Sequence, residues 1–187
     1  PVIYLSFADV KQDCYGDTVQ KIRHIIGDTY RQHRYLLDAL CFTEAEKHQF
    51  TKVMNCEMDD VTAQDALKNL SYYLHHYWRK RTILLLDEYD TPMQEAYVHG
   101  YWNEFINFIR GLFNSALKTN PYLERAVMTG ITRVSKESVF SDLNNLKVIT
   151  ITSEEYADCF GFTEEEVFAA LKQTGLEDKK TDVKEWY

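Results

Sequence analysis

The chain has 187 residues, of which seven are glycine and three are proline, together roughly 5% where about 12% is usual. So few turn-forming residues argue against a many-stranded sandwich or barrel, and no two glycines lie close enough together to form a phosphate-binding loop. The 29 acidic residues exceed the 21 basic ones, which gives a formal net charge of −8 and disfavours a broad nucleic-acid-binding surface.

The sequence carries no feature of a secreted or membrane protein. No apolar run approaches the roughly 18 residues of a membrane-spanning helix, and no signal-peptide pattern opens the chain. The four cysteines include no Cys-x-x-Cys pair, which favours reduced thiols over a disulfide framework. We therefore expect a cytoplasmic protein with no membrane partner.

Hydrophobic periodicity predicts strands and helices that alternate along the chain. The opening run from Val2 to Phe7 is nearly all apolar and predicts a strand buried on both faces. Further strands are predicted at residues 82–86, 126–131 and 147–151. Helices are predicted to begin after the capping residues Asp17, Thr43, Thr62 and Thr163, and another covers residues 102–118.

Strands separated by long helices are typical of parallel pairing, with helices on the faces of the sheet. We therefore expect an α/β fold. The predicted α/β core covers residues 1–152, and residues 153–187 form a charged, helical extension of the same domain.

The most informative local pattern is an acidic strand end. Four apolar residues, 83–86, run directly into Asp87 and Glu88, and ligands of an open parallel sheet bind beyond the carboxyl ends of its strands. Asp87 would hold Mg²⁺ there, while Glu88 would activate a water molecule as general base, which is the chemistry of a Walker B strand. An ordinary polar loop after a buried strand shows the same pattern, so both interpretations stay open.

The next strand also ends in polar residues. Thr129 would lie beside the acidic strand end and hydrogen-bond an attacking water or a γ-phosphate, and Arg133 would stabilise phosphate charge. The alternative is a strand-forming threonine followed by a solvated loop arginine, and the residues alone favour that alternative.

Five blocks of the sequence resemble the AAA-ATPase-like domain, which is common in bacterial proteins. They are Leu86-Asp87-Glu88-Tyr89-Asp90-Thr91-Pro92, the stretch from Thr129 to Lys136, Leu143-Asn144-Asn145-Leu146, residues 156–158 together with 160–167, and the closing Glu185-Trp186-Tyr187. The resemblance implies a three-layer P-loop NTPase fold that binds ATP and Mg²⁺. It also implies Asp87 as the metal ligand and Glu88, Thr129 and Arg133 as catalytic residues.

One expected part of such a domain is missing. The Walker A pattern Gly-x-x-x-x-Gly-Lys-Thr/Ser does not occur in the chain, and neither does any Gly-Lys dipeptide. We therefore expect an incomplete P-loop fold without its Walker A strand, as an internal fragment of a longer protein. The isolated chain would be inactive and would bind no ATP tightly.

The resemblance also implies a neighbouring region, because such domains often precede a PD-(D/E)XK nuclease-like region in the same polypeptide.

Two other functions stay open. The chain would be a degenerate NTPase-like scaffold that binds a protein partner, or a metal-dependent nuclease using Asp87, Glu88 and Asp90. A nuclease of that type needs a Glu-x-Lys on a neighbouring strand, and the one Glu-x-Lys present, at residues 177–179, falls in a charged loop.

Overall fold

The computed structural model describes residues 1–39, 41–131, 146–150, 152–159 and 161–186. The chain divides into two compact units, Pro1–Asn144 and Asn145–Tyr187. The predicted boundary between residues 152 and 153 stays a prediction. Among the helices that the structure describes, none is long and apolar enough to cross a membrane.

The first unit is an α/β domain. Its strands and helices, in chain order, are β1 (Val2–Ser6), α1 (Tyr15–Gln32), η1 (Arg34–Asp38), α2 (Glu44–Met54), α3 (Asp60–Trp78), β2 (Thr82–Asp87), α4 (Thr91–Val98), α5 (Trp102–Phe113), η2 (Asn114–Lys118) and β3 (Leu123–Met128). Helix α5 runs directly into the single π-helical turn η2.

The strands form one sheet in the order β1-β2-β3, and both pairs are parallel. Leu85 at the centre of β2 lies opposite Tyr4 on one side and Val127 on the other. The expected α/β fold with a parallel sheet is thereby confirmed.

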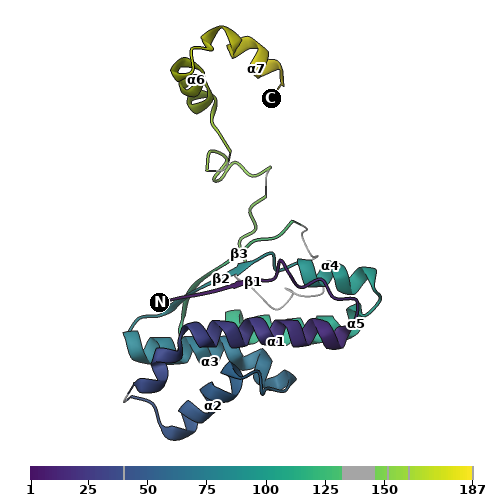
Figure 1. The fold of residues 1–187 in the computed structure, drawn as a ribbon, viewed down its shortest axis with the longest axis vertical. Coiled ribbons are helices and arrows are strands. Elements are labelled where there is room, and N and C mark those ends of the chain that lie inside the picture. Colours follow the sequence, from purple (N-terminus) through teal and green to yellow (C-terminus); the bar gives the residue numbers. More distant parts are fainter. Residues whose placement is uncertain (40, 132–145, 151, 160, 187) are drawn as a thin grey trace. The chain divides into compact units, whose positions relative to one another are not determined.

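Among the described residues, the side chains of this sheet are buried on one face and exposed on the other. Ile3 and Leu5 of β1 and Leu84 and Leu86 of β2 are at most 1% exposed, and Figure 1 shows α1, α3 and α5 together on one side of the strands. On the opposite face Val2, Tyr4, Ile83 and Val127 are 37–53% exposed. The prediction that β1 is buried on both faces is therefore wrong.

The core lies between the buried face and the helices. It is built from apolar residues at helical spacing, among them Ile22, Ile26, Leu67, Leu70, Leu74, Phe105, Ile109 and Leu112. Tyr30, also fully buried, donates a hydrogen bond from its hydroxyl to the Ala66 carbonyl at 2.7 Å and packs its ring against Phe50. Burial of these faces is the main source of stability of the first unit.

The helix starts agree with the sequence where a full capping box is present. Thr43 and Glu46 form the predicted box at the start of α2. Helix α3 begins at Asp60, because Asp59 accepts the Thr62 amide at 2.8 Å, so the predicted start at Thr62 is wrong. Asp17 is likewise no cap: it lies in the first turn of α1, where a negative charge suits the helix dipole.

Two of the predicted strands differ from the structure. The third strand lies at Leu123–Met128, three residues earlier than predicted. Residues 147–150 form no strand, and Ile151 lies outside the described residues. The β-branched side chains of Val148, Ile149 and Thr150 favour a strand, but a strand also needs a neighbour for its backbone N–H and C=O groups, and the described residues provide none.

The second unit contains α6 (Glu164–Gln173), η3 (Glu177–Lys179) and α7 (Lys180–Trp186). Thr163 and Glu166 form the predicted capping box of α6. Lys180 and Lys184 lie over the Phe168 ring, at 5.2 and 5.5 Å from its centre. No residue of these three helices is buried.

The one-sided burial of the sheet predicts unequal costs for two neighbouring substitutions in β2. Leu84→Ala should lower the free energy of unfolding by about 2–5 kcal/mol, because Leu84 is fully buried. Ile83→Ala should cost about 1 kcal/mol or less, because Ile83 faces the open side. Urea denaturation of both variants checks this, and equal losses would contradict an open face.

Candidate functional site

Polar residues from all three strands meet at the carboxyl edge of the sheet. The register pairs Ser6 with Asp87 and Leu86 with Met128, so the next residue after β3, Thr129, falls beside Asp87. The Thr129 amide donates to the Leu86 carbonyl at 2.9 Å, which continues the pairing past the end of β3. Because side chains alternate along a strand, Ser6, Asp87 and Thr129 form one row on the open face.

Three hydroxyl groups hold the Asp87 carboxylate in this row. Thr129 Oγ1 donates to Asp87 Oδ1 at 2.5 Å, and the hydroxyls of Tyr4 and Ser6 both donate to Oδ2 at 3.3 Å. These bonds, the one from Thr129 above all, lower the pKa of Asp87. The carboxylate is therefore ionised at neutral pH and has a fixed orientation.

Glu88 has an unusual backbone conformation for its residue type. Its φ of +50° lies in the left-handed region, which a residue with a Cβ enters at a cost of order 1 kcal/mol. The Glu88 amide donates to Thr129 Oγ1 at 3.3 Å, and its Oε2 accepts from the hydroxyl of Thr91, the first residue of α4, at 3.2 Å. Such strain is concentrated at functional sites.

The structure thus brings together three of the four residues that sequence reasoning singled out: Asp87, Glu88 and Thr129. The fourth, Arg133, lies outside the described residues.

Sequence reasoning missed Tyr4, Ser6 and Thr91. Ser6 is a polar residue at a strand end, so the rule that found Thr129 would also have found it. Tyr4 could not be found in this way, because its role depends on the register of β1 against β2 and on the reach of its hydroxyl.

The residues in the row suit a hard divalent cation. Asp87 presents ionised carboxylate oxygens, Glu88 follows it, and the surrounding groups are hydroxyls, so every donor is oxygen, the ligand that Mg²⁺ prefers. A second group, Asp13, Cys14 and Asp17, has ligand atoms within 4.8 Å of one another. All three of its residues are exposed, and a thiol is a poor ligand for Mg²⁺.

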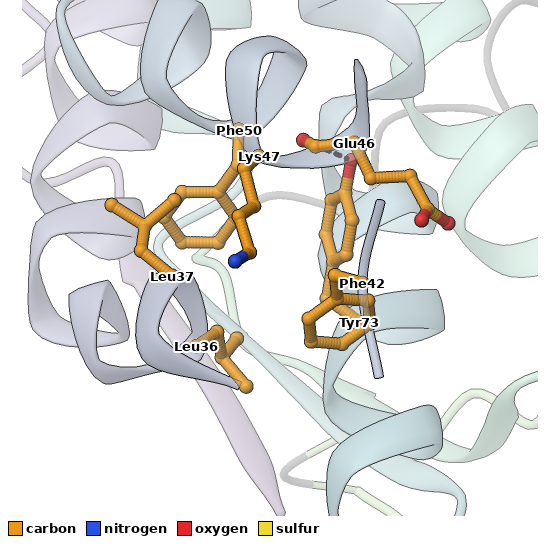
Figure 2. Close-up of a pocket in the computed structure, with 7 residues that line it drawn as sticks. All are labelled: Leu36, Leu37, Phe42, Glu46, Lys47, Phe50 and Tyr73. Carbon is orange, nitrogen blue, oxygen red and sulfur yellow. Dashed lines mark hydrogen bonds between the residues drawn. The ribbon is translucent and has the colours of Figure 1, made fainter. Parts of the chain in front are cut away.

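A shallow depression lies elsewhere in the first unit, between η1, α2 and α3 (Figure 2). Its lining consists of Leu36, Leu37, Phe42, Glu46, Lys47, Phe50 and Tyr73. The rings of Phe42 and Phe50 pack edge-on against Tyr73, whose hydroxyl donates to the Glu46 carbonyl at 3.2 Å. The Glu46 carboxylate is engaged by the Tyr72 hydroxyl and by the capping box, so the depression reflects packing.

The sequence profile of a family described as "Predicted AAA-ATPase" matches residues 1–140. The chain belongs to the AAA-ATPase-like family. It is 32% identical over 111 residues to a protein of Azotobacter chroococcum mcd 1 named "Uncharacterized protein in vnfD 5'region". The match covers 58% of this chain and 21% of that protein, so the chain spans about a fifth of the relative's length. No solved structure matches the chain.

Family membership confirms the resemblance drawn from the sequence motifs. The three-stranded parallel sheet flanked by helices agrees with a P-loop type of fold. Asp87 and Glu88 of the block at residues 86–92 lie beside Thr129 of the next block, at neighbouring strand ends.

The hydrogen bonds to Asp87 predict the effect of removing each hydroxyl. Thr129→Val should raise the pKa of Asp87 toward its ordinary value, because it removes the largest cause of the lowering. Ser6→Ala should raise it less, because that bond is longer. NMR titration of the carboxyl carbons measures both, and an equal or larger effect of Ser6→Ala would contradict the assignment.

The lowered pKa of Asp87 determines how the stability of the folded chain depends on pH. A pKa lowered in the folded protein stabilises it above the unfolded value of about 4, and this stabilisation is lost as the pH falls through the folded pKa. The acid dependence of the free energy of unfolding should therefore be weaker in Thr129→Val than in the unsubstituted chain.

Proposed function

We propose that this chain supplies the metal-binding and water-activating half of an ATP site, and that a phosphate-binding loop outside these 187 residues supplies the other half. The observation that carries the proposal is the row around Asp87: an ionised, oriented carboxylate next to a strained glutamate at the carboxyl edge of a parallel sheet. The absence of any Gly-Lys dipeptide in the chain is the reason to place the phosphate-binding loop elsewhere.

The open face of the sheet supports this division. Asp87 projects from the same face as the exposed Val2, Tyr4, Ile83 and Val127. A phosphate-binding loop leads into a helix whose N-terminal amides point at the phosphates. Such a helix over these apolar side chains would complete the three-layer fold, and its preceding strand would pair with the edge strand β3. Its N-terminus would then lie near Asp87.

Asp87 and Glu88 have separate roles in the proposed site. Asp87 would bind a hydrated Mg²⁺ ion, which neutralises phosphate charge when bound. Glu88 would accept the proton of the attacking water. The Thr91 hydroxyl donates to Glu88 Oε2 and so orients the carboxylate that would accept this proton.

The hydrogen bonds of Thr129 favour a positioning role over direct contact with water or a phosphate. Its single hydroxyl proton is donated to Asp87, so it would have to break that bond to donate to water or a phosphate. We assign it to holding Asp87 and the Glu88 amide in place. The role of Arg133 in stabilising phosphate charge stays a proposal.

The two alternatives differ in their support. In the structure Glu177 and Lys179 lie in η3 of the second unit, so no strand carries the Glu-x-Lys that a nuclease would need. The open apolar face favours a scaffold that binds a partner, and the experiments below separate the scaffold from the ATPase.

The ATPase proposal predicts the effect of one substitution in a longer protein that contains this chain and a Walker A loop. Glu88→Gln should abolish ATP turnover and leave nucleotide binding intact, because the amide cannot accept a proton. The matched control is Glu124→Gln, at an exposed position near the other end of β3. A colorimetric phosphate-release assay decides, and unchanged turnover in Glu88→Gln would remove Glu88 from the mechanism.

The division of the site predicts weak nucleotide binding by the 187 residues alone. Without the backbone amides and lysine of a phosphate-binding loop, Asp87 and Glu88 offer only negative charge to the nucleotide. Titration calorimetry with Mg-ATP should show no tight binding. A dissociation constant in the micromolar range would contradict the proposed division.

A further inference from the structure

Asp90 is a buried carboxylate without a part in the mechanism above. It is 1% exposed and occupies the N-cap position of α4, yet its side chain makes no capping bond to that helix. Its Oδ2 instead accepts the Ile131 amide at 3.1 Å and the Gln94 side-chain amide at 2.9 Å. A buried carboxylate is costly unless it is hydrogen-bonded, and both of these bonds are made by Oδ2.

Gly130, the residue after Thr129, leaves room for this carboxylate because it has no Cβ. A Cβ at Gly130 would lie 2.5 Å from Asp90 Oδ1 and 2.9 Å from Tyr89 Cε1. Real Cβ atoms do not approach other atoms so closely, so any other residue here would displace the carboxylate or the Tyr89 ring. Close approach, rather than an unusual φ, is therefore the reason for glycine at this position.

The segment 129–131 is held against the segment 87–90 along its whole length. Thr129 Oγ1 contacts Asp87 and the Glu88 amide, the Thr129 carbonyl accepts the Tyr89 amide at 3.0 Å, and the Ile131 amide donates to Asp90. The bond to Asp90 is charge-assisted, and such bonds are about twice as strong as neutral ones.

We infer that Asp90 is a positioning residue: its buried carboxylate clamps the chain after β3 and thereby keeps Thr129 on Asp87 and Glu88. The clamping bond comes from the Ile131 amide, which lies two residues after Thr129, on the other side of Gly130. The consequence for catalysis rests on the proposed ATPase function, whereas the clamp itself does not.

The clamp is tested first in this chain by amide hydrogen exchange in NMR spectra. Asp90→Asn should speed exchange of the Tyr89 and Ile131 amides about tenfold, because a neutral amide oxygen accepts more weakly. The Thr82 amide, bonded to the Tyr122 carbonyl at the other end of β2, should exchange at its original rate. Asp38→Asn, which removes the same charge from an exposed position, should change none of the three.

A second variant tests the clamp without changing any charge. Gly130→Ala should speed exchange of the Tyr89 and Ile131 amides in the same way, because its methyl group displaces the carboxylate. Unchanged exchange of these two amides in both variants would overturn the inference. An equal acceleration of exchange at all three amides would also overturn it, because Asp90 would then stabilise the whole domain and not this segment in particular.

The catalytic consequence is tested in the longer protein. Asp90→Asn should lower kcat about tenfold or more and change KM for ATP much less, because Thr129 orients Asp87 and Glu88 without contacting the nucleotide itself. Combined with Thr129→Val, it should lower kcat no further than Thr129→Val alone. Additive losses would overturn the inference. A longer protein without ATPase activity would overturn the proposed function alone, because the exchange measurement needs no ATP.

Discussion

The parallel pairing of β2 with a strand on each side is the constraint on which the rest of the structure depends. It brings the carboxyl ends of three strands to one edge, so residues about 80 and 40 positions from Asp87 in sequence become its hydrogen-bond partners. A one-residue slip of β2 would turn Asp87 toward the buried face and expose Leu86 instead. The apolar face that fixes the register therefore also fixes the orientation of the site.

The same pairing leaves a sheet with two unlike faces. One is buried against α1, α3 and α5, and the other presents Val2, Tyr4, Ile83 and Val127 to solvent beside Asp87. Exposed apolar area of this kind is stabilised when another element covers it. An element that covered the open face would end next to Asp87, so completion of the fold and completion of the site would be one event.

Local sequence signals predicted what local forces determine. The apolar run before Asp87 predicted β2, and the capping boxes at Thr43 and Thr163 predicted α2 and α6, because in each case the deciding contacts lie within a few residues. Family motifs predicted that Asp87, Glu88 and Thr129 form one site. Their mutual hydrogen bonds follow from the register, which no single segment encodes.

The missed features depend on partners distant in sequence. A strand that is apolar throughout has the same sequence whether its second face is covered or open, so Val2–Phe7 could not reveal the exposure of Tyr4. Val148, Ile149 and Thr150 illustrate the converse: they have strand propensity, but no described strand pairs with them, and they form none. In the sequence Asp90 stood out only as part of a family motif and as an acidic residue that a nuclease would use, and its burial and its contact with the Ile131 amide appear only in the folded chain.

The most direct test of the account locates the metal. Mn²⁺ is a paramagnetic substitute for Mg²⁺, and its broadening of amide NMR signals falls steeply with distance. In the longer protein with ATP, substoichiometric Mn²⁺ should broaden the signals of Asp87, Glu88 and Thr129 most, and that of Thr82, about 15 Å away at the other end of β2, much less. Broadening centred on Asp13–Asp17, or no selective broadening, would contradict a metal site at the carboxyl edge of the sheet.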